Sequence, residues 1–446
     1  MTTRLRWHVA LLVVSALLVP GVSRANPYDM FGAGARAASM GGAHTAATND
    51  ASANYYNPAL LARLPHLQLD IGYSHARPNL RLNDQSLGVD SARGTRIALG
   101  MPGQVGKFRL GVGVSVYLPD QQLTRIRSLS ESQPRFALYD NRPQRYVLSV
   151  NAGLAIGDKF SIGGGIGYLT GTEGELSLAG RVGFPDAEDS ELRLDMDVDV
   201  VTIPYPILGV AYQVRPWLAI AASYRGGAQP VSDLNLTVEG DIGAANIDPI
   251  VADALVDIHT VSLFHFQPAE FTLGLDALIS KGLRIAADLS FHRWSAFSNP
   301  AARLNTELEL GEFNELVDLP AETPLAKASY HDILIPRLGA EWTLREGAKS
   351  TLQGRLGYSY EPSPAPEQIG ATNLVDNDKH TASLGVGATL RDWTEILLQP
   401  LSIDLSVALS SLPSRTHHKL SPIDAVGDYQ SRGTVWQFAT TTRVRF

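Results

Sequence analysis

The sequence predicts an all-β fold, a 14-stranded antiparallel transmembrane β-barrel plugged by its own N-terminal segment. Three observations support this prediction: an export signal begins the chain, apolar and polar residues alternate through most of the rest, and short connections alternate with long ones. The 446 residues include no cysteine, so disulfide bonds do not hold the exported fold together. After the export signal, no apolar run is long enough for a membrane-spanning helix.

Residues 1–25 have the parts of a secretory signal peptide. Two arginines near the start precede an apolar run over 9–19, which is shorter than the roughly 20 residues of a spanning helix. Ser23 and Ala25 supply the small residues that a signal peptidase requires. We therefore expect cleavage after Ala25, so that the mature protein begins at Asn26.

From about residue 66 onward the dominant hydrophobic period is two, which is typical of strands with one apolar and one polar face. The alternation is clearest over 67–74, 108–118 and 401–410. We predict 14 strands, an even number as in bacterial outer-membrane barrels. They lie near 66–76, 94–102, 107–118, 145–156, 160–169, 207–214, 217–238, 261–279, 282–297, 332–343, 351–361, 379–391, 400–411 and 433–446.

The predicted connections form a short set and a long set that alternate along the chain. The short links are 103–106, 157–159, 215–216, 280–282 and 345–350, and the long ones are 77–93, 119–144, 170–206, 239–260, 298–331, 362–378 and 412–432. This asymmetry is typical of outer-membrane barrels, whose short turns face the periplasm. We therefore expect both termini in the periplasm.

A barrel of this size needs a plug. Its lumen is too wide for its own side chains to fill, since about eight strands is the size at which they do. Residues 26–65 are the predicted plug, because they lack the period of two and are rich in alanine and glycine. The predicted domains are thus a signal peptide at 1–25, a hatch at 26–65 and a barrel at 66–446. Phe446 ends the last alternating strand, and such an aromatic C-terminus resembles the signal that the barrel-assembly machinery recognises.

Charge and motifs exclude several classes of ligand. The net charge of −8 and the absence of a basic cluster argue against nucleic acid. The glycines at 32–37 match a dinucleotide fingerprint, but the strand that this motif requires does not precede them, so we expect no cofactor. Asp195, Asp197 and Asp199 alternate with apolar residues and lack the glycine and glutamate of a calcium loop. They predict a polar strand face rather than a metal site, with divalent ions bridging them to lipopolysaccharide as the alternative.

The positions of the candidate catalytic residues also argue against an enzyme. His292 and Ser290 share one strand face by parity, whereas Ser295 lies on the other. No nucleophile motif surrounds these residues, although acyl transfer or hydrolysis needs a nucleophile, a base and an orienting group within reach of one another. We expect no catalytic residue.

Residues 239–260 interrupt the strand pattern, and their apolar residues fall at helical spacing. We expect a short amphipathic helix there, whose apolar stripe consists of Ile247, Ile250, Val251, Ala254, Leu255 and Ile258. Two interpretations of the stripe remain open. It forms an extracellular groove for a hydrophobic ligand, since burial gains roughly 25 cal/mol per Å² of apolar surface, or it packs the loop onto its neighbours.

Four short motifs resemble the FadL family of outer-membrane transporters, and together they cover nearly the whole mature chain. The first is GAGARAASMGGAHTAATNDASANYYNPALLARL, which ends in Asn57, Pro58 and Ala59 and then has Leu60 and Leu61 where the family usually has Gly-Leu. The others contain Tyr224 and Arg225; Pro268, Gly274, Asp288, Trp294, Ser295 and Phe297; and Arg337, Leu338, Gly339, Tyr358, Tyr360 and the prolines of 362–366.

The resemblance implies a barrel of 14 strands with an N-terminal hatch in its lumen. Members of this family capture a hydrophobic ligand at an extracellular groove and release it sideways through a gap in the wall beside the hatch. Asn57, Pro58 and Ala59 would then meet the lateral opening, although Asn-Pro is also an ordinary turn signal at the end of the hatch. Asp288, Trp294, Phe297 and Tyr358 are the barrel positions that carry the family signature.

We therefore expect passive uptake of hydrophobic small molecules, such as long-chain fatty acids or hydrocarbons, by a monomer in the bacterial outer membrane. Its expected partners are the ligand, outer-membrane lipid, lipopolysaccharide and the barrel-assembly machinery. The alternative is a barrel of this type that serves as an assembly or attachment partner for surface proteins. A continuous hydrophobic path through the lumen favours transport, whereas a blocked lumen with a large loop surface favours the partner role.

Overall fold

The computed structural model describes residues 32–120, 133–140, 146–170, 172–183, 191–199, 201–229, 231–243, 251–263, 266–300, 303–309, 327–370, 372–391, 399–420 and 426–446. The predicted signal peptide and the first residues of the predicted plug, at 26–31, lie outside these ranges.

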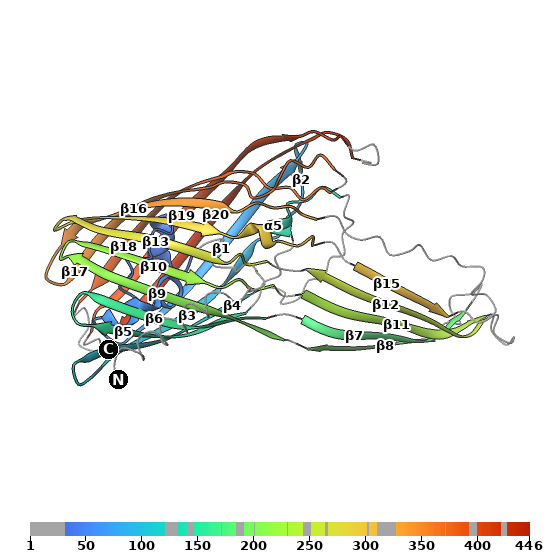
Figure 1. The fold of residues 1–446 in the computed structure, drawn as a ribbon, viewed down its shortest axis with the longest axis horizontal. Coiled ribbons are helices and arrows are strands. Elements are labelled where there is room, and N and C mark those ends of the chain that lie inside the picture. The colour runs from blue at the N-terminus through green and yellow to red at the C-terminus, as the bar shows by residue number, and fades with distance from the viewer. Residues whose placement is uncertain are drawn as a thin grey trace, which may run out of the picture.

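The described strands form a closed antiparallel barrel, and the predicted number of 14 strands is confirmed (Figure 1). Each strand pairs with its neighbours in chain order, and β20 returns to pair with β1 from Gln68 opposite Arg445 to Leu82 opposite Ser431. The barrel strands are β1 (Gln68–Leu82), β3 (Ala92–Val105), β4 (Phe108–Pro119), β5 (Val147–Ile156), β6 (Phe160–Thr170), β9 (Thr202–Arg215), β10 (Leu218–Arg225), β13 (Glu270–Ser280), β14 (Leu283–His292), β16 (Ile333–Glu346), β17 (Ser350–Glu361), β18 (Lys379–Leu390), β19 (Leu401–His417) and β20 (Tyr429–Arg445). The short β2 (Gln85–Ser86) extends the end of β1.

The outer face of the barrel is apolar. Large apolar side chains with exposures of 36% or more occur at alternate positions of most wall strands, for example Ile71, Val112, Leu273 and Leu405. Water-soluble proteins rarely expose apolar surface on this scale. A closed sheet with an apolar outer face satisfies every backbone group without water, which is the requirement for crossing a bilayer with strands.

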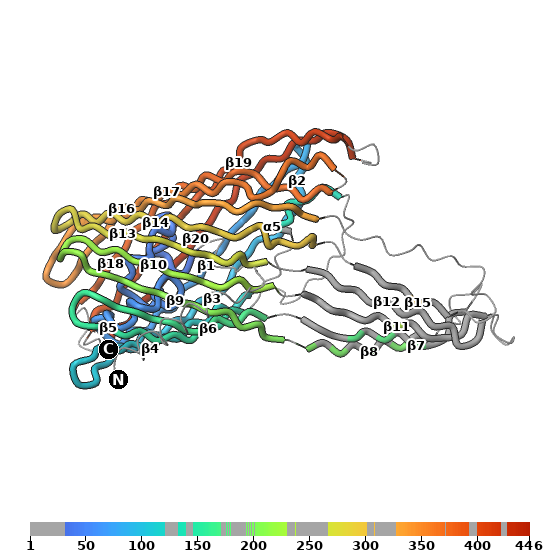
Figure 2. Tube along the Cα trace, in the orientation of Figure 1, coloured from blue at the N-terminus to red at the C-terminus, as the bar shows by residue number. Residues whose placement is uncertain are grey.

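Residues 32–65, which we call the hatch, lie inside the barrel, where Figure 2 shows them in blue. The hatch contains α3 (Ala35–Ser39), α4 (Ala53–Tyr56) and the 3₁₀ helix η1 (Pro58–Arg63). Glycines on the inner wall allow its backbone to touch the strands: a Cβ on Gly111 would lie 2.2 Å from the carbonyl of Leu61, and one on Gly163 would lie 2.4 Å from the amide of Ala59. The plug predicted from the alanine-rich and glycine-rich composition is therefore packed backbone against backbone.

The end of the hatch is set by local chemistry. The Asn57 side chain accepts a hydrogen bond from the Ala59 amide at 3.1 Å, and Pro58 occupies the first helical position of η1, which suits proline. Leu60 and Leu61 lie within η1 and have no positive φ, so the glycine that the family usually has after the motif is not needed here. Within the described ranges, no helix has both the length and the apolar character to cross a membrane.

A second sheet forms in the long connections at the end of the barrel opposite the C-terminus (Figure 1). Its five strands run in the order β15 (Arg303–Glu309), β12 (Val251–Leu263), β11 (Val231–Gly243), β7 (Thr172–Gly183) and β8 (Glu191–Asp199). β7 and β11 pair in parallel, and the other neighbours are antiparallel. Asp195, Asp197 and Asp199 lie on β8 with exposed side chains, which confirms the predicted polar strand face.

The helix predicted over 239–260 is wrong. β11 continues to Gly243, and β12 begins at Val251 and pairs with both β11 and β15. These two ladders supply hydrogen bonds that a helix would have to make alone, and the β-branched residues of β12 favour an extended backbone. Ile247 and Ile250 lie outside the described residues, whereas Val251, Leu255 and Ile258 lie on β12. The groove assigned to the apolar stripe over 247–258 stays a prediction.

Two predicted strands are each divided in the structure. The prediction over 217–238 joins β10, which ends at Arg225, to β11 of the second sheet, and the prediction over 261–279 joins β12 to β13. At the first division the Gly226 amide donates to the Pro206 carbonyl at 2.8 Å, outside the β9–β10 ladder. At the second division Pro268 has no N–H for a ladder. The chain changes from one sheet to the other at these points.

Candidate functional site

The end of the barrel that carries the long connections is filled by apolar side chains. We call the buried set around Phe266, Trp294, Phe297, Tyr330 and Ile335 the extracellular apolar cluster. Its ring centroids lie 5.2 Å apart for Phe266 and Trp294 and 4.5 Å apart for Phe297 and Tyr330. The 3₁₀ helix η3 (Trp294–Ala296) positions these rings, because the Phe297 amide donates to the Trp294 carbonyl at 2.9 Å. Two of the signature positions, Trp294 and Phe297, therefore belong to one aromatic cluster.

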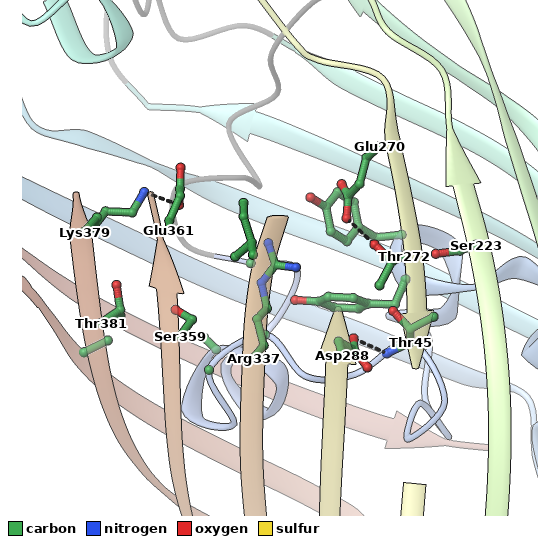
Figure 3. A pocket seen from close by; sticks show the side chains of 18 of the residues that line it. Thr45, Ser223, Glu270, Thr272, Asp288, Arg337, Ser359, Glu361, Lys379 and Thr381 are labelled. Carbon is green, nitrogen blue, oxygen red and sulfur yellow. Dashed lines mark hydrogen bonds and ion pairs between the residues drawn. The ribbon is translucent and has the colours of Figure 1, made fainter. Parts of the chain in front are cut away.

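A small polar cavity lies between the hatch and the charged wall residues beside this cluster (Figure 3). It has a volume of about 90 Å³ and is lined by hatch residues such as Thr45 and by charged wall residues. Arg337 projects from β16 into the space between Glu270 and Glu361 (Figure 3). Glu361 pairs with Lys379 at 2.5 Å, and Glu270 pairs with Arg225 at 3.3 Å. The guanidinium of Arg225 also lies 3.7 Å from the ring centroid of Tyr55 in the hatch, a cation–π contact.

Buried ion pairs hold the hatch across the lumen. Arg36 of the hatch donates two hydrogen bonds to Glu341 of β16, at 2.8 and 2.9 Å. Asp50 of the hatch lies 2.8 Å from Arg443 of β20. We call the network of Arg36, Asp50, Asp70, Glu341, Arg355, Asp404 and Arg443 the ionic clamp; none of these side chains is more than 9% exposed.

Strand register builds the wall half of the clamp. Glu341 lies opposite Arg355 on β17, and Asp70 lies opposite Arg443 on β20, so each pair spans one ladder. Arg355 contacts Glu341 and Asp404 at 2.7 Å each, and Arg443 contacts Asp70 at 2.8 Å. Glu341, Asp50 and Asp404 each contact two of these arginines, so removing one such carboxylate takes a partner from two buried cations.

Asp288 is a second anchor of the hatch. Its carboxylate accepts hydrogen bonds from the backbone amides of His44 and Thr45, both at 2.9 Å (Figure 3). This signature position therefore fixes a turn of the hatch to β14, and its role is structural. In the same region Ser290 bonds to Thr272 at 2.7 Å and to Arg337, whereas His292 lies 3.8 Å from Glu270.

The motif of Asn57, Pro58 and Ala59 is packed against the wall. The Asn57 amide group is fully buried and donates to the carbonyls of Val210 on β9 and Ala222 on β10, at 3.0 and 3.4 Å. It also donates to the Thr45 carbonyl within the hatch at 3.3 Å. The ladders of β4 with β5, β5 with β6 and β6 with β9 run without a register shift beside the motif. The wall is therefore closed there in this structure.

Comparisons with known proteins decide the family. The family model for outer membrane protein transport proteins (OMPP1/FadL/TodX) matches residues 22–446. The chain belongs to this family. Its membership confirms the predicted outer-membrane transport protein and argues against an enzyme.

The chain also resembles a curated protein and several solved structures. The chain is 24% identical over 419 residues to alkane uptake protein A of Marinobacter nauticus, covering 89% of this chain and 86% of that protein. A Pseudomonas aeruginosa FadL homologue has a TM-score of 0.57 and 14% identity, covering 96% of this chain and 99% of the other. The Pseudomonas putida toluene transporter TodX has a TM-score of 0.51 and 15% identity, covering 93% and 98%. At these identities the solved structures show the fold alone.

The fourth signature residue lies apart from the others in this FadL-family protein. Tyr358 is 47% exposed on the outer face of β17, and its hydroxyl lies 2.8 Å from the His380 ring nitrogen. Sequence reasoning also missed the ionic clamp. A usable signal existed, because Glu341, Arg355 and Asp404 are isolated charges on wall strands, and ionisable residues at membrane depth indicate a functional site.

Asp376 lies in the extracellular connection between β17 and β18, beside the apolar cluster. Its neighbours Leu374 and Val375 belong to that cluster, and its carbonyl accepts a hydrogen bond from Arg415 at 3.0 Å. Burial raises the pKa of the Asp376 carboxyl from 3.8 to about 7; Glu361 raises it further, and Lys379 opposes the shift. The folded protein therefore binds this proton more tightly than the unfolded chain does.

We predict that Glu341→Gln loosens the hatch, because both Arg36 and Arg355 lose a carboxylate partner. Breaking a buried ion pair in this way costs about 3–5 kcal/mol. The melting temperature in detergent should fall, and the conductance of the barrel in planar bilayers should rise. Asp158→Asn is the control, since that fully exposed side chain pairs with Arg109 at 3.2 Å. An unchanged conductance in Glu341→Gln would contradict the role of the clamp.

We predict that Asp376→Asn removes a pH dependence of stability. In the native protein stability should decline as the pH rises from about 4 to about 7, because the buried carboxyl loses a proton that it prefers to keep. Asparagine mimics the neutral acid, so the variant should be more stable than the native protein above pH 7 and equal to it below pH 4. Melting temperatures across this range test the prediction, with the exposed Asp84→Asn as control. Parallel pH profiles for Asp376→Asn and the native protein would contradict it.

Proposed function

We propose that this protein takes up hydrophobic small molecules, such as long-chain fatty acids or hydrocarbons, passively across the outer membrane. The observation that carries the proposal is the order of environments along the lumen. The extracellular apolar cluster comes first, and the hatch with its ionic clamp follows. Alkane uptake protein A and the toluene transporter TodX, by their names, handle molecules of this class.

The apolar cluster supports binding of a hydrophobic ligand from the outside. Transfer of apolar surface out of water gains roughly 25 cal/mol per Å², and the exposed aromatic and aliphatic surface of a displaced cluster would provide that environment. Phe266, Trp294, Phe297 and Tyr330 come from connections and strand ends rather than from the middle of the wall, so they can move without opening the barrel.

The charged hatch supports a lateral exit. A hydrophobic ligand that moved straight through the lumen would have to separate the pairs of the ionic clamp, whose partners are buried. Beside the clamp, the wall of β4, β5, β6 and β9 carries Gly111, Gly163 and Gly209 where it meets the hatch. We propose that the ligand leaves through this part of the wall, next to Asn57, Pro58 and Ala59, after the motif moves away from it.

The outer surface of the barrel suggests its other partners. The apolar outer face contacts outer-membrane lipid and lipopolysaccharide, and we propose that the protein acts as a monomer. Phe446 has a 60% exposed side chain, and its amide donates to the Leu67 carbonyl at 2.8 Å. This placement leaves its ring accessible to the barrel-assembly machinery that we propose recognises it.

The second sheet favours an alternative function as an assembly or attachment partner. Within the described residues β8 and β15 are its edge strands, and an open edge is a template for pairing with a strand of another protein. Measuring uptake of hydrophobic ligands distinguishes the transport role from the partner role. A correctly inserted barrel that moves neither a fatty acid nor a panel of hydrocarbons would support the partner role and contradict uptake.

We predict that a transporter-deficient strain expressing the chain takes up radiolabelled long-chain fatty acid or alkane, and that Ile335→Asn reduces the rate about tenfold. An amide in place of an apolar side chain of this cluster adds about 1–3 kcal/mol to the barrier for a hydrophobic ligand. Ile335 is 1% exposed and belongs to the apolar cluster, whereas its neighbour Leu334 is 53% exposed on the outer face. Leu334→Asn is therefore the matched control and should retain uptake. Equal rates in both variants would argue against a path past Ile335.

The exit route is tested with Asn57→Asp. This substitution keeps the acceptor that caps η1 and removes the donor to the wall carbonyls of Val210 and Ala222. For a lateral exit we expect altered uptake of the hydrophobic ligand without leakage of small polar solutes. Glu341→Gln is the comparison: leakage of polar solutes with unchanged hydrophobic uptake is expected. Faster hydrophobic uptake in Glu341→Gln, together with an unchanged rate in Asn57→Asp, would indicate a straight path through the lumen.

A further inference from the structure

A second cavity lies on the other side of the hatch, toward the short turns and the C-terminus. It has a volume of about 280 Å³ and is lined by hatch residues Arg36 and Asn49 together with the ends of several wall strands. Seven of its lining residues are basic and two are acidic: Arg36, Lys281, Arg284, Arg355, Arg391, Arg443 and Arg445 against Glu341 and Asp404. The cavity is therefore strongly cationic and faces the predicted periplasmic side.

The carboxylates around the cavity do not balance this charge. Asp50 and Asp70 lie behind the lining and pair with Arg443, and Asp276 pairs with Arg284 at 3.4 Å. Five carboxylates thus face seven cations among the residues that the structure describes, which leaves two positive charges in excess.

The excess positive charge lies on three residues at the rim of the cavity. Lys281 lies in the tight turn between β13 and β14, Arg391 follows β18, and Arg445 ends β20. None of the three forms an ion pair with a carboxylate in the described part of the chain. Arg445 instead donates to the Ser402 hydroxyl at 3.2 Å. An anion in the cavity would offset the repulsion among its basic side chains.

The size and chemistry of the cavity select a class of ligand. Its volume lies just below the roughly 300–1,000 Å³ of small-molecule pockets, and its lining is mainly polar, so an acyl chain would not be stabilised there. Guanidinium groups bind oxyanions through paired hydrogen bonds, and a phosphate group carries about −1.5 to −2 charges at neutral pH. A single phosphate group therefore matches the two excess charges.

We propose that this cavity is a phosphate-binding site open to the periplasm. A free phosphate and the head group of an anionic phospholipid present the same chemistry to it. The bound group contacts Arg36 of the hatch and basic residues of the wall together, so it ties the hatch to the barrel. The site lies on the opposite side of the hatch from the extracellular apolar cluster and is independent of the proposed uptake of hydrophobic molecules.

The test is thermal unfolding of the purified full barrel in uncharged detergent with increasing inorganic phosphate, against chloride at equal ionic strength. A ligand that binds only the folded state raises the melting temperature with its concentration. We expect a saturable rise in the native protein and at least about tenfold weaker phosphate binding in the double variant Lys281→Gln, Arg391→Gln. Both residues lie outside the ionic clamp, so the hatch should remain in place.

A charge-matched control separates this site from general screening. Lys107→Gln, Arg109→Gln removes two positive charges at another short turn that does not line the cavity. It should keep the native response to phosphate. No saturable rise in the native protein, or the same loss in the control variant as in the Lys281 and Arg391 variant, would overturn the proposal for free phosphate.

Reconstitution distinguishes the two sources of the phosphate group. The barrel is placed in phosphatidylcholine vesicles with or without phosphatidylglycerol, and its melting temperature is measured in the absence of free phosphate. A rise with phosphatidylglycerol that depends on Lys281 and Arg391 assigns the site to the lipid head group. A response to inorganic phosphate alone assigns it to the soluble ion, and a response to neither overturns the proposal.

Discussion

Closure of the sheet is the constraint from which the other features follow. Lipid offers no hydrogen-bond partner to a strand edge, so β20 must return to β1, and it does so along the full length from Gln68 to Leu82. A closed barrel of 14 strands has a lumen wider than its own side chains can fill. The hatch fills that space, and it needs wall glycines such as Gly111 and Gly163 to come close and the ionic clamp to stay there. The wall glycines, the hatch and the buried charges thus all follow from closure of the sheet.

The lumen separates two chemistries, one on each side of the hatch. Aromatic rings around Trp294 and Phe297 occupy the extracellular side, whereas the cavity lined by Lys281, Arg391 and Arg445 occupies the other. In the proposed mechanisms a hydrophobic ligand would be stabilised on the first side and would meet buried charge at the hatch, whereas a small anion would be stabilised on the second side. The hatch would then be the boundary between the two binding environments.

The sequence predicts what is local in this protein and misses what depends on distant pairing. Period-two alternation and the lengths of the connections identify the barrel, because each strand reports its own two faces. The helix expected over 239–260 fails because β11 and β12 obtain their hydrogen bonds from β7 and β15, which the local spacing does not reveal. The clamp is hidden for the same reason. Parity places Glu341 on the lumen face, but only the folded hatch brings Arg36, 305 residues away, within 2.8 Å of it.

The two sets of contacts that hold the hatch differ in strength, and this difference gives the proposed lateral route its physical basis. The clamp consists of buried ion pairs, and breaking one costs about 3–5 kcal/mol. Asn57 holds the wall of β9 and β10 through neutral hydrogen bonds at 3.0 and 3.4 Å, each contributing about 0.5–1.5 kcal/mol. Thermal motion or an arriving ligand would therefore release the Asn57 motif from the wall before it releases the clamp. A barrel built in this way would open toward the membrane while it stays closed to water and ions.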